Sequence, residues 1–180
     1  MAGNERRVAF VTGGSRGVGK GIAVELAKAG FDVAIASRTM QEGEAREHSS
    51  TLKKSDTRPL PGSNQSTVEL IESQGGRAFP VYLDLLDKAS LGFAVATVLE
   101  RHGRIDVLVN NARYIGPGHM DRFYDTAVDI IDRHLQANAL APLVLTKLVI
   151  DQMIERGEGA VINITSGAAL VDPTLPVGQG

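Results

Sequence analysis

Short apolar runs alternate along the chain with stretches whose apolar residues recur at helical spacing, and this alternation constrains the fold most strongly. The runs have no polar face, which is typical of strands that are buried on both sides of a parallel sheet. Five strands are expected, at residues 7–12, 32–37, 78–83, 105–110 and 160–165. Because helical stretches join these strands, we expect an α/β fold with a doubly wound parallel sheet.

Proline in the third expected strand constrains the order of the sheet. Pro80 cannot donate a backbone hydrogen bond, and a sheet tolerates proline mainly in an edge strand. The strand order 3-2-1-4-5 places this strand at an edge. We therefore expect that order.

Three helical stretches show apolar faces and end signals. The first ends before Gly30, the second stops at Gly103, and the third covers residues 123–156. Pro142 is expected to bend or re-cap the third stretch near Asn138, because proline removes a helical donor. The apolar residues expected on the buried faces are Val18, Ile22 and Leu26, then Leu91, Val95, Val98 and Leu99, and finally Leu145, Leu148, Val149 and Met153.

Composition excludes several classes of protein. The chain has 180 residues, 43% of them hydrophobic, which suits a single globular domain over residues 1–180. Nineteen basic and 21 acidic residues leave no field for a nucleic-acid backbone, so no nucleic-acid partner is expected. There is no cysteine, and the four histidines lack metal-ligand spacing, so no metal site is expected. With no signal segment or membrane span recognised, we expect a cytoplasmic protein without a membrane partner.

A glycine-rich turn, TGGSRGVG at residues 12–19, lies between the first strand and the first helix. Glycines let the backbone approach a pyrophosphate, and the free amides of the helix N-terminus stabilise its charge. The turn also fits the first seven positions of a phosphate-binding P-loop. That motif next needs Ser or Thr for magnesium, where this chain has Gly21, so an NTPase is disfavoured.

The turn has the spacing Thr-Gly-x-x-x-Gly-x-Gly, and four further signals follow in order. They are Asp84 after the third strand, Asn110-Asn111-Ala112 after the fourth, Asn138 in the long helical region and Ser166 after the fifth strand. In these features the chain resembles the short-chain dehydrogenase/reductase family over nearly its whole length. The resemblance implies a Rossmann-like fold that binds a nicotinamide dinucleotide.

The resemblance also implies which residues contact the cofactor. Glycines of the turn line the pyrophosphate, Asp84 and Leu85 approach the adenine, and the Asn110 loop supports the cofactor. The expected cofactor-binding residues are Gly13, Ser15, Arg16, Gly17, Val18, Gly19, Ser37, Arg38, Asp84, Leu85, Asn110 and Ala112. Asn110 and Thr12 have an alternative role, in which they satisfy backbone groups and hold neighbouring loops together.

The end of the second strand bears on the choice of cofactor. NAD(H) is usually held by an acidic side chain at this place, which accepts from the ribose hydroxyl. The chain has Ala36-Ser37-Arg38 there, and Arg16 offers a second cation. These residues suit a 2′-phosphate, so NADP(H) is favoured over NAD(H). Alternatively, Arg38 is a solvated loop arginine. A methyltransferase is disfavoured, because it too would need the acidic residue.

Catalysis in the family uses Ser, Tyr and Lys, with an Asn that holds a proton-relay water. Ser166 and Asn138 match the first and last of these roles. None of the tyrosines at positions 82, 114 and 124 is followed by lysine four residues later. The family's spacing puts the Tyr-x-x-x-Lys pair about a dozen residues beyond Ser166 or slightly later, where the sequence ends.

Two functions follow from these residues. The leading one is an NADP(H)-dependent oxidoreductase that acts on a small carbonyl compound or secondary alcohol. The alternative is a non-catalytic NADP(H)-binding protein, a sensor or scaffold. Residues after Gly180 would discriminate them, since a Tyr-x-x-x-Lys pair there would support the enzyme.

Two loops are expected beside the site. Residues 39–65 are polar and rich in charge, and we expect a surface insertion that is either a solvated loop or a lid over the cofactor. Arg113 replaces the glycine that the family has after Asn-Asn-Ala. It points out of the cleft or meets an anionic substrate or the cofactor. The turn-rich segment 114–122 is expected to shape specificity.

The fifth strand reads as buried on both faces and carries no lysine or proline to protect an edge. We therefore expect the domain to be incomplete at its C-terminal side. A polypeptide ending at Gly180 is expected to be poorly soluble or oligomeric, and the complete protein a homo-oligomer, dimer or tetramer.

Overall fold

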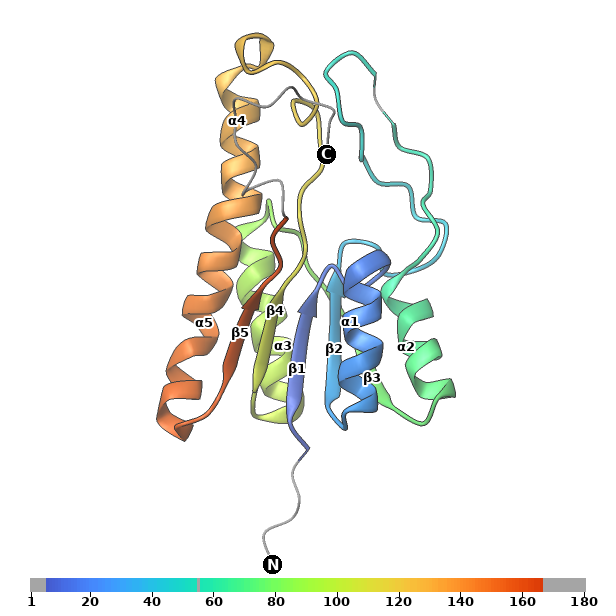
Figure 1. Cartoon of the computed structure of the whole chain (residues 1–180), viewed down its shortest axis with the longest axis vertical. Helices are drawn as coiled ribbons and strands as arrows, with labels where there is room; N and C mark the ends of the chain where they lie inside the picture. The colour runs from blue at the N-terminus through green and yellow to red at the C-terminus, as the bar shows by residue number, and fades with distance from the viewer. Residues whose placement is uncertain (1–5, 55, 167–180) are drawn as a thin grey trace, which may run out of the picture.

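The computed structural model describes residues 6–54 and 56–166, which form a five-stranded parallel sheet with helices on both faces (Figure 1). The strands are β1 (Val8–Thr12), β2 (Asp32–Ser37), β3 (Arg77–Tyr82), β4 (Val107–Asn110) and β5 (Ala160–Asn163). The helices are α1 (Gly17–Lys28), α2 (Asn64–Ser73), α3 (Lys88–His102), α4 (Val128–Leu135) and α5 (Ala141–Arg156). The order is β3-β2-β1-β4-β5, so the expected doubly wound sheet is confirmed.

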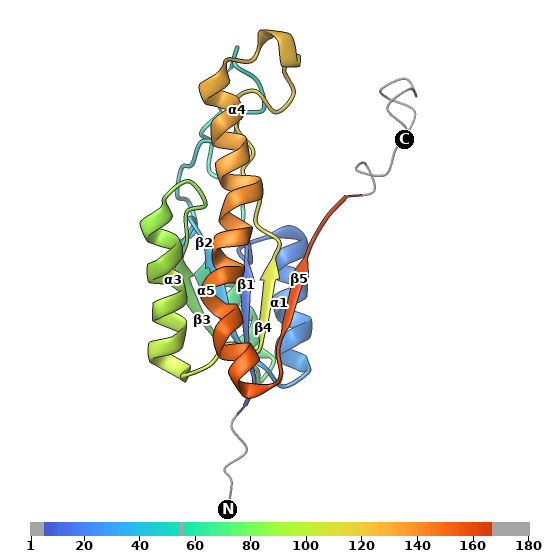
Figure 2. The same cartoon turned by 90° about the vertical axis from the view of Figure 1, so that its left-hand side faces the viewer.

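Side chains alternate between the two faces of the sheet and build two cores. Phe10 and Leu108 face a core that α3 and α5 cover, whereas Val11 and Ile35 face a core that α1 and α2 cover. Figure 2 shows α3 and α5 on one side of the sheet and α1 on the other. This arrangement directs the carboxyl ends of all the strands to one edge, where loops can build a site.

The two edges of the sheet differ in burial. Pro80 lies in the edge strand β3, opposite Ile35 of β2, as its missing donor requires. At the other edge, the expectation that the fifth strand is buried on both faces is wrong. Ala160, Ile162 and Asn163 are exposed, because β5 pairs with β4 on one side and, among the described residues, has no neighbour on the other.

The buried face of α1 also differs from the prediction. Val18 is 66% exposed, and the helix buries Gly19, Ala23 and Ala27 instead. These small residues recur every fourth position, so the helix can lie close to the sheet directly after the glycine turn. Ile22 and Leu26 flank this face and are only partly buried.

The long helical region divides where Pro142 predicts a break. A π-helical turn, η2 (Gln136–Leu140), separates α4 from α5, and Pro142 lies in the first turn of α5. From α5, Leu145, Val149 and Met153 enter the core, while Leu148 stays partly exposed, against the prediction. Within the described chain, the continuous helical stretch 128–156 is long and apolar enough to span a membrane, with 28% of its most apolar window buried.

The insertion between β2 and α2 rises above the carboxyl ends of the strands, as does α4 (Figure 1). Its described residues hold one isolated β-bridge, between Thr51 and Lys54, and no longer element. Helix α2 begins at Asn64, one residue before the expected end of the insertion. Ser63 caps this helix by accepting a hydrogen bond from the Ser66 amide.

Candidate functional site

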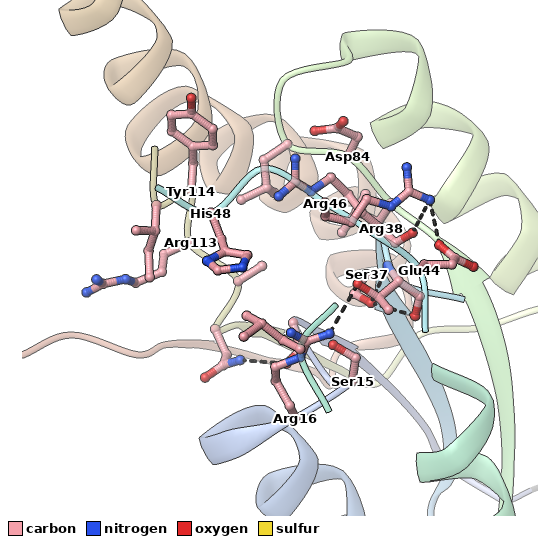
Figure 3. A pocket seen from close by; sticks show the side chains of 18 of the residues that line it. Ser15, Arg16, Ser37, Arg38, Glu44, Arg46, His48, Asp84, Arg113 and Tyr114 are labelled. Carbon is pink, nitrogen blue, oxygen red and sulfur yellow. Dashed lines mark hydrogen bonds and ion pairs between the residues drawn. The ribbon is translucent and has the colours of Figure 1, made fainter. Parts of the chain in front are cut away.

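A pocket of about 280 Å³ lies at the carboxyl ends of the strands. It collects residues that follow β1, β2, β3 and β4, although these lie far apart in the sequence (Figure 3). Eight of the residues expected to bind a cofactor line it: Gly13, Ser15, Arg16, Ser37, Arg38, Asp84, Leu85 and Ala112. The pocket is therefore the candidate site.

The glycine turn forms the floor of the site. Gly13 and Gly17 have φ angles of +69° and +54°, which side chains with a Cβ rarely adopt. A Cβ on Gly19 would collide with the carbonyl oxygen of Gly13 and the side-chain amide of Asn111. Helix α1 starts at Gly17 with no side-chain cap, so its first amides are open to an anion.

Thr12 and Asn111 fasten this turn to the loop after β4. The Thr12 hydroxyl donates to the carbonyl of Val109 at 3.0 Å and accepts from the amides of Asn111 and Ala112 at 3.1 and 3.0 Å. Asn111 Nδ2 donates back to the Thr12 carbonyl at 2.9 Å. Thr12 thus acts through the backbone, which is the loop-holding role left open by the sequence.

Asn110 is not one of the residues that line the pocket. It is buried, and its Nδ2 donates to Asn163 Oδ1 at 3.0 Å and to Thr146 Oγ1 at 3.4 Å. The side chain therefore links β4 to β5 and α5. Gly17, Val18 and Gly19 also lie outside the pocket lining.

The residues after β2 are held by the insertion. Ser37 Oγ donates to Asn64 Oδ1 at 2.7 Å, and Arg38 Nη2 donates to the Glu47 carbonyl at 3.4 Å. Arg16 Nη2 reaches the Gly62 carbonyl at 2.8 Å and Thr39 Oγ1 at 3.3 Å. Burial lowers the Arg16 pKa, nearby Glu42 opposes the shift, and the charge of Arg38 lowers the pKa by a smaller amount.

Asp84 is fixed by the turn that follows β3. Its amide donates to Ser90 Oγ at 2.9 Å, and its Oδ1 accepts from the Leu86 amide at 2.9 Å. The neighbouring Leu85 is buried, so together they give the pocket one polar and one apolar wall residue.

Six lining residues come from the insertion, and the sequence reasoning did not single them out: Thr39, Glu44, Arg46, His48, Arg58 and Leu60. Arg46 Nη2 donates to Glu44 Oε2 at 2.6 Å and to the Arg38 carbonyl at 3.0 Å. Figure 3 shows Arg38, Arg46 and Glu44 close together. The available signal was a run of charged or titratable side chains within 15 residues of the end of β2, among them Glu44, Arg46 and His48.

Arg58 is paired within the insertion. Its Nε and Nη2 donate to the two carboxylate oxygens of Asp56 at 2.9 and 2.6 Å. These hydrogen bonds from Arg58 hold the pKa of Asp56 well below its usual range. The pair therefore stays charged and adds little net charge to the pocket.

The insertion also meets the loop that follows β4. The Met120 amide donates to the Ser50 carbonyl at 2.8 Å, and the Leu52 amide donates to Asp121 Oδ2 at 2.7 Å. Asp121 Oδ2 also accepts from the Gly118 amide at 2.9 Å. The two segments join beside the pocket, so the insertion is tied at its tip as well as at its base.

Three further residues lie outside the lining or at its rim. Asn138, in η2, bonds both the amide and the carbonyl of Tyr114, at 2.7 and 3.2 Å. Ser166 is exposed after β5. Arg113 lines the rim, where its Nη2 lies 3.2 Å from His119 Nε2, and its side chain points away from the labelled cations (Figure 3).

Comparison with known proteins identifies the family. A family model described as short chain dehydrogenase matches residues 7–62 and 57–175. The chain belongs to the short-chain dehydrogenase family. The resemblance carried by the glycine turn and the Asn110 loop is thereby confirmed.

Similar proteins of this family are found in distant organisms. An uncharacterized oxidoreductase of Thermotoga maritima is 30% identical over 92% of this chain and 55% of its own length. The dehydrogenase/reductase SDR family member 7 of Homo sapiens is 30% identical over 95% of this chain and 44% of its own length. The chain thus spans about half the length of these curated relatives.

Solved structures of the family share the fold. A metagenomic short-chain oxidoreductase in complex with NADP has a TM-score of 0.70 at 28% identity, covering 89% of this chain and 62% of that one. An actinorhodin polyketide ketoreductase variant with NADPH has a TM-score of 0.74 at 27% identity, covering 97% and 58%.

The residues of the pocket fit an anionic ligand such as a dinucleotide. Nε of Arg16 and Nε of Arg46 are buried and, within the described part of the chain, have no hydrogen-bond partner. Both groups can donate to an anion in the pocket. Among residues 6–54 and 56–166, no cluster of three His, Cys, Asp or Glu side chains could hold a metal ion.

Proposed function

We propose that the chain is the cofactor-binding part of an NADP(H)-dependent oxidoreductase that transfers hydride between NADP(H) and a small carbonyl or secondary alcohol substrate. The observation that carries the proposal is the pocket itself. It gathers the glycine turn, the cationic residues after β2 and the Asp84 turn around one space.

The charge of the pocket supports NADP(H) over NAD(H). Arg38 follows β2 where an acidic residue would hold the ribose of NAD(H). Glu44 does line the pocket, but its two oxygens already accept from the Gln41 amide and Arg46. These bonds lower the pKa of Glu44 and leave the cations of the pocket to face a phosphate.

The neighbours with bound NADP and NADPH support the same cofactor. When bound, the cofactor supplies or accepts the hydride. Ser166 would hydrogen-bond the substrate oxygen as its negative charge develops, which is the role the family assigns to this serine. Asn138 would support the site by fixing the backbone of Tyr114, since both ends of its amide bond that residue.

A non-catalytic NADP(H)-binding role is the second candidate. Tyr82, Tyr114 and Tyr124 all lack a lysine four residues later, so the 180-residue sequence holds no Tyr-x-x-x-Lys pair. A sensor or scaffold would bind the cofactor without turnover. Loss of NADPH absorbance with a panel of carbonyl compounds, measured on the parent protein, separates the two roles.

Arg38→Asp tests the cofactor preference. The substitution should lower the affinity for NADPH about tenfold or more, because it replaces a charged donor to the phosphate with a negative charge. The affinity for NADH should rise or stay unchanged, because an acidic side chain at this position can accept from the ribose hydroxyl. Affinities are measured by calorimetric titration, with Arg101→Asp as control. Arg101 lies in the last turn of α3 and does not line the pocket. An unchanged preference for NADPH would refute the role of Arg38.

Two further proposals concern the whole protein. We place it in the cytoplasm and expect a homo-oligomer. The exposed strand β5 supports the second expectation, since its outer edge pairs with no other strand among residues 6–54 and 56–166 and is a ready site for another strand. Light scattering of the parent protein measures the oligomer size, and a monomer would refute this expectation.

A further inference from the structure

The insertion contributes Arg46 to the pocket, and this arginine belongs to none of the sequence motifs described above. Arg46 lies eight residues beyond Arg38 in sequence, yet its guanidinium is bonded to the Arg38 carbonyl at 3.0 Å. Arg38 in turn reaches back to the Glu47 carbonyl at 3.4 Å. The two arginines therefore cross over the end of β2, next to Ser37, and both line the pocket (Figure 3).

Arg46 is held in place while part of its hydrogen-bonding capacity is left unused. Its Nη2 makes both of the described bonds, to the Arg38 carbonyl and to Glu44. Its Nε is buried without a partner among the described residues. A guanidinium has five N–H donors in a rigid fork, so Arg46 can offer donors to a ligand without breaking the bonds that position it.

Arg16 is less available than the sequence suggests. Its Nη2 bonds the Gly62 carbonyl and Thr39 Oγ1, so this side chain fastens the base of the insertion to the glycine turn. Arg58 is bonded bidentately to Asp56. Of the cations that the insertion contributes, Arg46 is thus the one placed beside Arg38 with a free donor.

Gathering guanidinium groups is costly in the absence of an anion, because like charges repel in a partly buried space. Burial is the main cause of the lowered Arg16 pKa, and the charge of Arg38 adds to it. A phosphate monoester carries about two negative charges near neutral pH and accepts several hydrogen bonds, so it would relieve the repulsion. The ribose hydroxyl of NAD(H) has no such charge.

We propose that Arg46 is a specificity-determining residue that binds the ribose 2′-phosphate of NADP(H) together with Arg38. The inference rests on the proposed function. The insertion is then part of the cofactor site, and it distinguishes dinucleotides that carry the 2′-phosphate from those that lack it. Glu44 acts as the counter-charge that positions Arg46.

Two nucleotide fragments isolate this interaction. Adenosine 2′,5′-bisphosphate carries the extra phosphate and 5′-AMP lacks it, and neither needs the nicotinamide half of the cofactor. Calorimetric titrations should show that Arg46→Gln lowers the affinity for the bisphosphate about tenfold or more relative to wild type. The affinity for 5′-AMP should change less than about twofold. Arg46→Lys should keep part of the preference, since it retains the charge but not the fork.

Arg101→Gln is the matched control, because it removes one positive charge outside the pocket. Thermal unfolding of each variant checks that the fold is kept, and Arg46→Lys carries the test if Arg46→Gln does not fold. If wild type fails to prefer the bisphosphate and NADPH, the proposed cofactor is wrong. If wild type prefers both and Arg46→Gln keeps the same preference, only the role of Arg46 is refuted.

Discussion

The pocket has two walls that are built differently. One wall is the glycine turn with the loop after β4, where buried backbone groups bond each other through Thr12 and Asn111. The other is the insertion, held by charged side chains such as Arg16 and Asp121 at partly exposed positions. The first wall depends on close approach of backbones, and the second on charge. We therefore expect the first to govern global stability and the second to govern ligand choice and local opening.

The largest expected effect comes from adding a methyl group to the first wall. In Gly19→Ala the new Cβ meets the Gly13 carbonyl and the Asn111 amide, so the turn must shift. Unfolding free energy should fall by about 3 kcal/mol, measured by chemical denaturation. Gly21→Ala is the control, because its Cβ meets nothing within 4 Å and should stabilise α1 slightly. Equal effects of the two substitutions would contradict the role of close approach.

Thr12→Val should give the next largest effect. The substitution keeps the shape of the side chain but leaves the Asn111 and Ala112 amides without their acceptor. We expect a loss of about 2 kcal/mol in unfolding free energy, since each unsatisfied buried group is costly. Thr97→Val, on the exposed side of α3, should change little. If Thr12→Val matched this control, the two loops would not depend on the hydroxyl.

Asp121→Ala tests the tip of the second wall. It removes the acceptor of the Leu52 and Gly118 amides and should leave global stability nearly unchanged. Trypsin cleavage after the exposed Lys53 should become about threefold faster or more, because local opening is easier. Asp129→Ala is the control, an exposed acid on α4. Slower or unchanged cleavage would show that the tip is held by other contacts.

The smallest expected effect is a pH dependence of the local stability of the loop after β4. Burial, then the charges of Arg113 and His134, lower the pKa of His119. A folded pKa below the unfolded value, about 6.5, means that protonation favours the open loop. The contribution of neutral His119 to the stability of the loop is complete above the unfolded pKa of about 6.5, and it is lost as pH falls through the folded pKa.

Hydrogen exchange of residues 114–122 checks this dependence. Protection factors should fall as pH is lowered from about 7.5 to about 5, and should stay flat in His119→Asn. The amides of the glycine turn should not follow the same trend. Protection that rises on acidification would contradict the sign.

The sequence predicted the features that depend on apolar periodicity and on glycine. The strand order and the Pro80 edge follow from such patterns. Arg38 was expected at the site from its place after the second strand, and Asp84 and Ala112 from the family resemblance. All three line the pocket. The buried face of α1 was predicted wrongly, because larger apolar residues gave the stronger signal. The structure buries Ala23 beside the sheet instead, where close packing favours small residues.

The contribution of the insertion could not be predicted in the same way. Its charged residues have no period, and the bond between Arg46 and the Arg38 carbonyl depends on how an irregular loop folds back. Burial of the fifth strand was also predicted wrongly. The run of apolar residues indicates a strand, but it does not indicate which elements cover it.

Nuclear magnetic resonance titration with NADPH tests most directly that the pocket is a dinucleotide site. The amides of Gly13, Gly17, Asp84 and Ala112 should shift together with one dissociation constant, and NADH should produce the same pattern more weakly. The amide of Gly75, in the hollow between α1 and α2, should not shift. Absence of binding, or shifts that gather around Gly75, would contradict the account.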